Sequence, residues 1–439
     1  MVSSFNRSMS GHFGRRGSSL GSPKVVGHKK SWISPSFHVL VVIGSLVSFI
    51  LAIGCGYHFV FPSLSQALHG HRISKFVNST GSCDVFKGRW VRDDGYPLYN
   101  GSGCPFLERG FNCLANGRKD RDYLRWRWKP NNCDIPRFNV QDVLERLRGK
   151  RVVFVGDSMS RTQWESLICL LMSGVEDKKS IYEVNRNKIT KRIRFLGVRF
   201  SSFNFTVEYF RSVFLVQNGL GPKNGPKRVK STLKLDKLVG ISKEWIDSDV
   251  LIFNTGHWWT PGKLFEMYLQ MNLNYELMMD TAKHSGYRGC YFQVGRSLKL
   301  GMSTTTAFRT AVDTWASWVE TMVNTNRTRV FFRTFEPSHW SDRNRRFCKV
   351  TRNPMSVTRG RDQSPFSDII SKVVKNMTVP ATVLHVTSMS AFRSDAHVGT
   401  WSDTPSVPDC SHWCLPGVPD VWNEIVFSHL LANNGLPLQ

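Results

Sequence analysis

The feature that most constrains the fold is a short apolar run that leads through a tight turn into an amphipathic helix. Residues 152–155 read Val-Val-Phe-Val, the continuous apolar stretch expected of a parallel strand that is buried on both faces. Gly156-Asp157-Ser158 follows, and apolar residues between Trp164 and Leu171 then recur at the spacing of one helix face. Strand, turn and helix in this order predict the start of an α/β unit.

The same alternation continues along the chain. Further strands are expected at 250–253, 330–332 and 383–386, and helices around 140–147, 307–323 and 418–431. The polar, basic stretch 341–370 reads as a long surface loop. The pattern predicts an α/β fold with three layers, in which helices cover both faces of a mostly parallel sheet.

The amino-terminal part has the composition of a membrane anchor. Residues 1–38 form a basic tail without acids, and residues 39–61 are apolar and uncharged, long enough to cross a hydrocarbon core of about 30 Å. Basic residues before the span keep the amino terminus cytoplasmic and place the rest in the lumen, as a type II signal anchor. A cleaved signal peptide is the alternative, with a passable cleavage site at Ser65-Gln66-Ala67.

The part after the span divides by composition. Residues 62–82 read as a stem, residues 83–139 as a Cys- and Trp-rich, irregular segment pinned by disulfides, and residues 140–439 as the regularly folded α/β domain. Roughly 150 residues per domain is the usual size, so 439 residues accommodate this division.

In the lumen, cysteines can form disulfides and N-glycosylation sequons can be modified. An even set of eight cysteines suggests four disulfides: Cys83, Cys104, Cys113, Cys133, Cys169, Cys348, Cys410 and Cys414. The candidate glycosylation sites are Asn78, Asn100, Asn204, Asn326 and Asn376. The spacing from Cys410 to Cys414 has no matching second pair, so no metal site is expected.

Three side chains predict nucleophilic chemistry. Ser158 follows a strand and opens a helix, where free N–H groups favour a developing negative charge. Asp409 and His412 lie three residues apart in a Cys- and Pro-flanked turn; the imidazole would take the serine proton and the carboxylate would orient the imidazole. The alternatives are a serine that only caps a helix and a polar turn beside a disulfide.

Here the sequence resembles a known family. Residues 156–167, which begin Gly-Asp-Ser-Met, and residues 409–417, which begin Asp-Cys-Ser-His, look like the two signature blocks of the plant trichome birefringence-like proteins. These are related to GDSL-type (SGNH) esterases. Further matching blocks include Tyr96-Pro97-Leu98-Tyr99 and residues 126–130, and the resemblance covers about residues 83–432.

The resemblance implies an SGNH-hydrolase-like fold and a polysaccharide O-acetyltransferase of the Golgi membrane. Ser158 would be the acyl nucleophile, His412 the general base and Asp409 its orienting partner. It also implies the disulfides Cys83–Cys133, Cys104–Cys169, Cys113–Cys414 and Cys348–Cys410.

In the related esterases a Gly and an Asn that follow successive strands join the serine N–H as oxyanion donors. Asn254, with Gly256 beside it, is the candidate here, and a turn-forming Asn-Thr-Gly is the alternative. After Phe335 the chain lacks the Gly-Gly-x-Cys stretch often seen in the family, which leaves the acceptor specificity open.

The net charge of the chain indicates the chemical class of its binding partner. The formal net charge is +26, and because residues 1–82 hold eight basic residues and no acid, +18 remains for the rest. Such a balance favours an anionic polysaccharide such as pectin or acid-branched xylan; the topology opposes nucleic acid. The expected reaction needs an acetyl donor, acetyl-CoA or another acetylated compound, but no bound cofactor, and a donor-supplying membrane protein is a further expected partner. A glycan acetylesterase with the same triad and a non-catalytic glycan-binding wall protein are the alternatives.

Overall fold

The computed structural model describes residues 43–50, 83–227, 229–260, 263–264, 289–342 and 345–432. Of the expected span at 39–61, only residues 43–50 fall within these ranges, and they are helical. Across the residues described, no helix is both long and apolar enough to cross a membrane. The sequon at Asn78 also lies outside the described residues.

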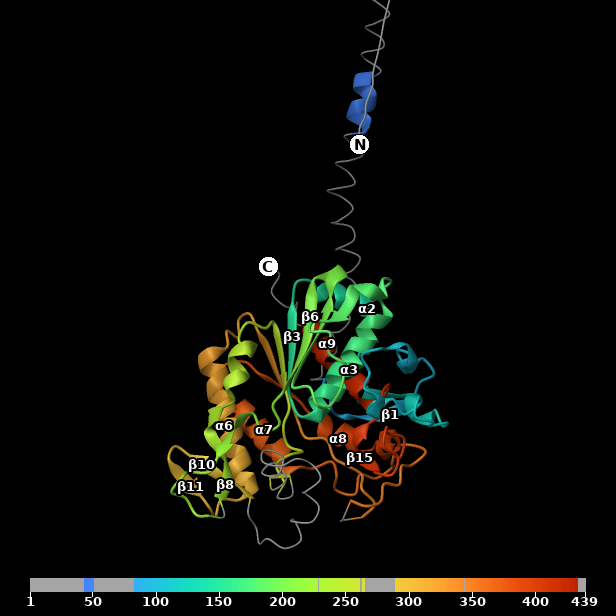
Figure 1. The fold of residues 1–439 in the computed structure, drawn as a ribbon. Helices are drawn as coiled ribbons and strands as arrows, with labels where there is room; N and C mark the ends of the chain where they lie inside the picture. Colours follow the sequence, from blue (N-terminus) through green and yellow to red (C-terminus); the bar gives the residue numbers. More distant parts are fainter. Residues whose placement is uncertain are drawn as a thin grey trace, which may run out of the picture. The chain divides into compact units, whose positions relative to one another are not determined.

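A seven-stranded sheet forms the centre of the fold (Figure 1). In spatial order its strands are β13 (Thr382–Leu384), β12 (Arg329–Arg333), β9 (Val250–Phe253), β3 (Arg151–Gly156), β6 (Phe205–Arg211), β5 (Phe195–Phe200) and β4 (Ile181–Glu183). The strands from β13 to β6 pair in parallel, and β5 and β4 continue the sheet antiparallel. The expected strands at 152–155, 250–253 and 330–332 are therefore confirmed as neighbours. The last expected strand ends earlier than predicted, because Val386 already begins the short helix α8 (Val386–Ala391).

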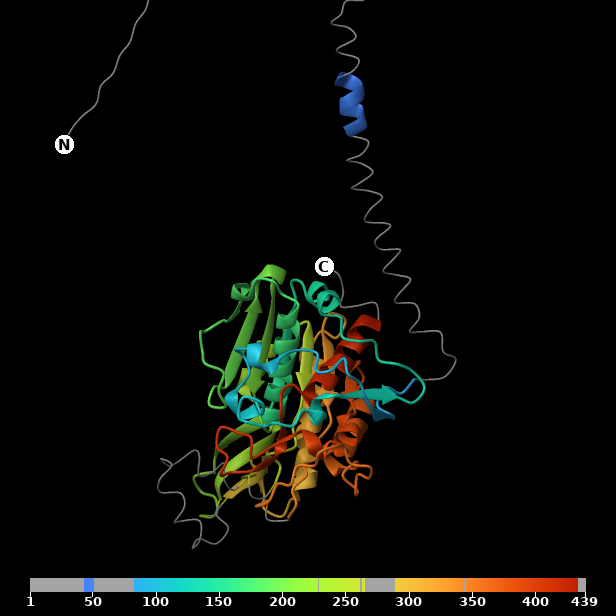
Figure 2. The ribbon, with the colours of Figure 1, turned by 90° about the vertical axis from the view of Figure 1, so that its right-hand side faces the viewer.

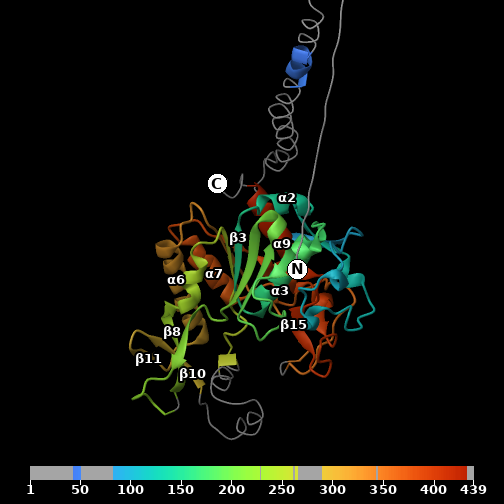
Figure 3. The same cartoon turned by 45° about the horizontal axis from the view of Figure 1, so that its top comes forward.

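Helices cover both faces of this sheet (Figures 1 and 3). One face carries α2 (Val140–Arg146), α3 (Ser158–Ser173) and α9 (Val418–Ala432); the other carries α6 (Thr304–Met322) and α7 (Pro365–Lys375). Strand β3 shows why both faces need cover, since Val152 and Phe154 pack into the core with α3 and α9. Val153 and Val155 point the opposite way, into the core with α6 and α7.

The expected loop at 341–370 is too long by several residues. Pro365 begins helix α7, where its missing N–H costs no helical hydrogen bond. A second, four-stranded sheet was also not expected from the sequence. It has the order β11 (Ser297–Lys299), β10 (Gly289–Val294), β8 (Val229–Leu238), β7 (Val216–Leu220), and β8 contacts α6.

The N-terminal segment, expected to be irregular, holds a two-stranded sheet and short 3-10 helices. Strand β1 (Gly88–Arg92) pairs antiparallel with β2 (Trp126–Pro130), which places Trp90 opposite Trp128. In Figure 2 this segment, drawn in cyan, lies across residues of the C-terminal part, drawn in red. The indole N–H of Trp90 donates to the main-chain oxygen of Met389 at 2.8 Å, which ties the two parts together.

Candidate active site

Ser158 lies at the carboxyl end of the central strand β3. The strand ends at Gly156, Asp157 caps the next helix, and Ser158 is the first residue of α3. A side chain at Gly156 would not fit, because a Cβ there would lie 2.1 Å from Oδ1 of Asn254. Ser158 is half-buried at the head of this helix, beside the end of β9.

His412 and Asp409 come from the distant C-terminal part. Both lie on β15 (Asp409–Trp413), which pairs with β14 (His397–Gly399). Oδ1 of Asp409 accepts the main-chain N–H groups of Ser411 at 2.8 Å and His412 at 3.0 Å. These two hydrogen bonds leave the other carboxylate oxygen free to face the imidazole.

The structure brings the three predicted side chains into one hydrogen-bonded chain. Oδ2 of Asp409 lies 2.6 Å from Nδ1 of His412, and Nε2 of His412 lies 2.7 Å from Oγ of Ser158. The carboxylate can only accept, so Nδ1 carries the proton and Nε2 is left to accept the serine hydroxyl proton. Burial raises the pKa of Asp409, but the adjacent His412 outweighs it and holds that pKa below its usual range.

The surroundings hold the imidazole from several sides. The Phe111 ring stacks on it with a centroid distance of 5.4 Å, and Nδ1 of His397 donates to the main-chain oxygen of His412 at 3.0 Å. Neighbouring residues are fixed covalently by the disulfides Cys113–Cys414 and Cys348–Cys410. The other two disulfides are Cys83–Cys133 and Cys104–Cys169. All four disulfides have the pairing that the resemblance implied.

The candidate oxyanion donors lie around the same turn. The N–H of Ser158 belongs to the first turn of α3, where amides have no partner within the helix. Asn254 directly follows β9, and its Nδ2 donates to Oδ1 of Asp157 at 3.0 Å, which leaves its second N–H as the one that could face an oxyanion. Gly256 has φ +147°, and a Cβ there would press on the Phe335 ring at 2.9 Å.

Sequence reasoning gave no role to Asp157, and it predicted His257 to be a structural or local cleft residue. Asp157 is fully buried, and its Oδ1 also accepts the main-chain N–H of Met159, while its Oδ2 lies 3.7 Å from Nδ1 of His257. Burial raises the pKa of Asp157, but His257, Asn254 and Met159 together lower it to about 2. The Gly156-Asp157-Ser158 motif was the available signal for Asp157, whereas the contact with His257 joins segments 100 residues apart.

Four of the five sequons lie in described residues. The side chains of Asn100, Asn204, Asn326 and Asn376 are all exposed. Within the described ranges, no cluster of three His, Cys, Asp or Glu side chains could hold a metal ion.

The chain has a three-layer α/β fold, with a serine at the end of its central strand. This serine is hydrogen-bonded to a histidine of the C-terminal part, which is hydrogen-bonded in turn to an aspartate. The combination is that of an acyl-esterase-like protein of the SGNH type. Residues 135–429 match the PC-Esterase family, described as a GDSL/SGNH-like acyl-esterase family found in Pmr5 and Cas1p. Residues 81–134 match the PMR5 N-terminal domain.

Comparison with curated proteins gives the family. Trichome birefringence-like 7 of Arabidopsis thaliana is 61% identical over 414 residues, which cover 93% of this chain and 88% of the relative. Trichome birefringence-like 9 of the same plant is 41% identical, with coverage of 85% and 89%. Trichome birefringence-like 6 is also 41% identical, over 80% of this chain and 70% of the relative. The chain belongs to the trichome birefringence-like family.

Proposed function

We propose that this chain is a polysaccharide O-acetyltransferase, which moves acetyl groups onto hydroxyls of a plant cell-wall polysaccharide through an acetyl-serine intermediate. The observation that carries the proposal is the hydrogen-bonded chain from Asp409 through His412 to Ser158. It combines an activated nucleophile, a base and an orienting carboxylate at the end of a strand, where ligands bind in open α/β sheets.

In the first half-reaction His412 takes the hydroxyl proton of Ser158 through Nε2. The serine oxygen bonds to the acetyl carbonyl carbon, and the carbonyl electrons move onto oxygen as an oxyanion. The oxyanion faces the head of α3, with the N–H groups of Ser158 and Asn254 as its donors. Collapse expels the donor's leaving group, which takes the proton from His412, and leaves acetyl-Ser158.

In the second half-reaction a glycan hydroxyl gives its proton to Nε2 of His412 and attacks the acetyl carbon. Collapse of the second oxyanion breaks the bond to Oγ of Ser158, which recovers the proton. Water competes for the acetyl group, so a transferase must hold the sugar hydroxyl at high effective concentration; well-oriented groups reach roughly 10⁵–10⁸ M.

We further propose that the protein is a single-pass type II protein of the Golgi membrane with its catalytic domain in the lumen. The basic, acid-free tail before residues 39–61, the disulfides and the exposed sequons support this placement. Protease added to sealed microsomes should then remove only a few kilodaltons, and digestion of residues 83–439 would contradict the luminal placement.

A glycan acetylesterase is the second candidate, because the matching family is described as an acyl-esterase family. One assay separates the two candidates. The purified chain is given a labelled acetyl donor and deacetylated xylan, mannan, xyloglucan or pectin oligomers, and products are read by mass. Acetylated glycan in excess over free acetate supports transfer. If acetate is only stripped from acetylated glycans across the whole panel, the esterase is the correct reading.

A further inference from the structure

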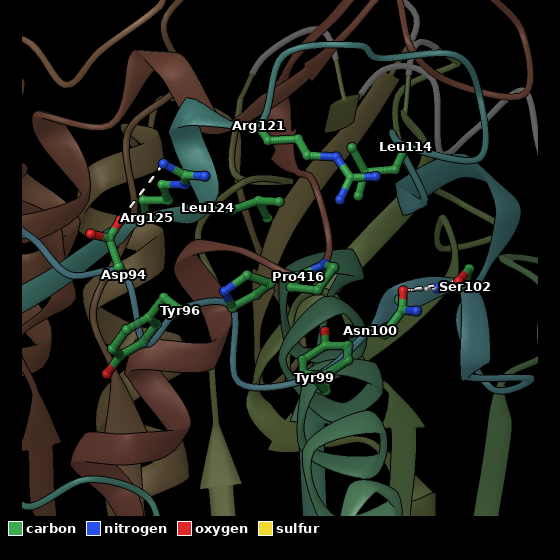
Figure 4. A pocket seen from close by; sticks show the side chains of 12 residues that line it. Asp94, Tyr96, Tyr99, Asn100, Ser102, Leu114, Arg121, Leu124, Arg125 and Pro416 are labelled. Atoms are coloured by element: carbon green, nitrogen blue, oxygen red, sulfur yellow. Dashed lines mark hydrogen bonds and ion pairs between the residues drawn. The ribbon is translucent and has the colours of Figure 1, made fainter.

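A pocket of about 690 Å³ lies in the N-terminal segment (Figure 4). None of Ser158, Asp409 and His412 lines it. Its walls come from the stretch that includes Tyr96 and Tyr99, from residues around Leu124, and from Pro416 of the C-terminal part. The volume is in the range of small-molecule and cofactor sites, roughly 300–1,000 Å³.

The pocket has an apolar floor. Tyr96, Tyr99, Leu124 and Pro416 are all buried. The tyrosine hydroxyls are already used, since Tyr96 donates to the carboxylate of Glu424 at 2.8 Å and Tyr99 to that of Asp420 at 3.3 Å. The tyrosines therefore offer ring carbons to a ligand, and rigid rings suit the apolar C–H face of a sugar.

The rim, in contrast, is exposed and basic. Arg121 and Arg125 flank the short 3-10 helix η4 (Asp122–Leu124), and both residues line the pocket. In Figure 4 the Arg121 side chain extends toward Leu114, whereas that of Arg125 points toward Asp94. Asp94 is the one acid in the lining, and it lies 3.6 Å from Arg125. In the part of the chain that the structure describes, Arg121 forms no ion pair with a carboxylate, whereas Arg125 pairs with Asp94. Two arginines against one aspartate leave the rim with a surplus positive charge, and a planar guanidinium matches a carboxylate with two parallel hydrogen bonds.

The pocket is physically joined to the candidate active site. Pro416 lies two residues after Cys414, and the lining residue Leu114 directly follows Cys113, its disulfide partner. The same stretch places Phe111 against the imidazole of His412. A polymer gripped in the pocket is therefore anchored to the unit that positions the base, and remote contacts of this kind lower the cost of orienting the reacting group.

We propose that this pocket binds a uronic acid unit of the acceptor polysaccharide, with the carboxylate at Arg121 and the sugar ring on the tyrosine floor. The proposal rests on the proposed polysaccharide transferase and names the chemical class of its acceptor. It gives a place to the Tyr96-Pro97-Leu98-Tyr99 block, which the catalytic chemistry leaves unused. It also assigns part of the surplus positive charge to a defined site.

The test is a binding measurement on the full chain in detergent, with Ser158→Ala to prevent turnover. Trigalacturonate and its methyl ester, which has the same rings without charge, are titrated by calorimetry. We expect the acid to bind at least roughly tenfold more tightly than the ester, since only the acid accepts charge-assisted hydrogen bonds from the guanidinium. Equal binding of acid and ester would overturn the proposal without touching the acetyl-transfer assay, which is read separately on neutral and acidic acceptors.

Arg121→Gln supplies the site-specific arm. Its matched control is Lys119→Gln, which removes the same charge from an exposed residue of the same stretch that does not line the pocket. Loss of the preference for the acid in Arg121→Gln and its retention in Lys119→Gln support the proposal, with melting temperatures showing that both variants fold. If both substitutions lowered the preference for the acid equally, the preference would come from general electrostatic attraction to the basic surface, and the proposal would be contradicted. Asn100 also lines the pocket. Acid binding that appears only after enzymatic removal of N-glycans would identify the protein's own glycan as the occupant and would overturn the proposal.

Discussion

Nδ2 of Asn254 lies 3.0 Å from Oδ1 of Asp157, and both side chains are buried beside the candidate nucleophile. Oδ1 of Asn254 in turn accepts the main-chain N–H of Asp157 at 3.3 Å. This reciprocal contact fixes the orientation of the amide, so its second N–H has a defined direction. A fixed donor needs no reorganisation when an oxyanion forms beside it.

Replacement of Asn254 by Ala should therefore lower kcat roughly 10²–10³-fold, the usual effect of losing one oxyanion donor, with little change in KM. Both half-reactions should slow, because each passes through an oxyanion at the same place. Pre-steady-state acetylation and acetate release measure the two steps. An unchanged kcat in Asn254→Ala would remove this residue from the oxyanion site.

The contact of Asp409 with His412 predicts a tautomer effect. Asp409→Asn keeps the size of the side chain but offers an amide to Nδ1, which favours the imidazole with its proton on Nε2 and hence no base for Ser158. Transfer should fall by orders of magnitude while the melting temperature stays close to that of the parent. Asp403→Asn, at an exposed aspartate of the preceding loop, is the matched control and should retain full activity.

The disulfides should differ in their effect on catalysis. The Cys113–Cys414 disulfide links the segment that carries Phe111 to the segment that follows His412. Its removal by double Ala substitution should therefore lower both the stability and kcat. Loss of Cys83–Cys133 should lower stability alone, since neither cysteine contacts the site. Native disulfides typically contribute about 2–5 kcal/mol. Equal catalytic losses at equal melting temperatures would contradict a positioning role for Cys113–Cys414.

A buried carboxyl group should give the stability a characteristic pH dependence. Burial raises the pKa of Asp420 from its usual value of 3.8 to about 7, although Ser166, Gly417 and Tyr99 donate to it and oppose the shift. Between these two pH values the folded chain binds more protons than the unfolded chain. The stability that protonated Asp420 contributes is therefore fully present below pH 3.8 and is lost as the pH rises through about 7.

The melting temperature of the parent should therefore fall between pH 5 and pH 8, and Asp420→Asn should fall less over the same interval because its side chain does not ionise. Differential scanning calorimetry at several pH values measures both slopes. Parallel slopes would show that Asp420 is ionised in the fold at pH 5.

The sequence was informative where the relevant pattern is local. The apolar strand before Ser158 appears in the structure as expected. The contact between Asp409 and His412 is also found, but both residues lie on strand β15 and not on the turn that the sequence predicted. The second sheet was missed although Leu233 and Leu235 alternate with polar residues, because local alternation does not name the partner strand.

Other features depend on contacts between distant segments. The buried contact between Asn254 and Asp157 joins positions 97 residues apart, and no spacing in the sequence predicts it. Trp126 and Trp128 do alternate with basic residues, as in a half-buried strand, but the density of Pro and Gly around them hid the pattern. The disulfide pairing likewise came from the family resemblance, since eight cysteines allow 105 pairings.

The acetyl-serine intermediate is the central claim, and trapping it is the most direct test. The purified chain is mixed with labelled acetyl donor without acceptor, quenched in acid within the first turnover and digested for mass spectrometry. The account predicts one additional acetyl group, 42 Da, on the peptide that carries Ser158, its disappearance when acceptor oligomer is added, and its absence in Ser158→Ala. Full transfer by Ser158→Ala, or acetyl label that never reaches Ser158 while acetylated glycan accumulates, would contradict the account.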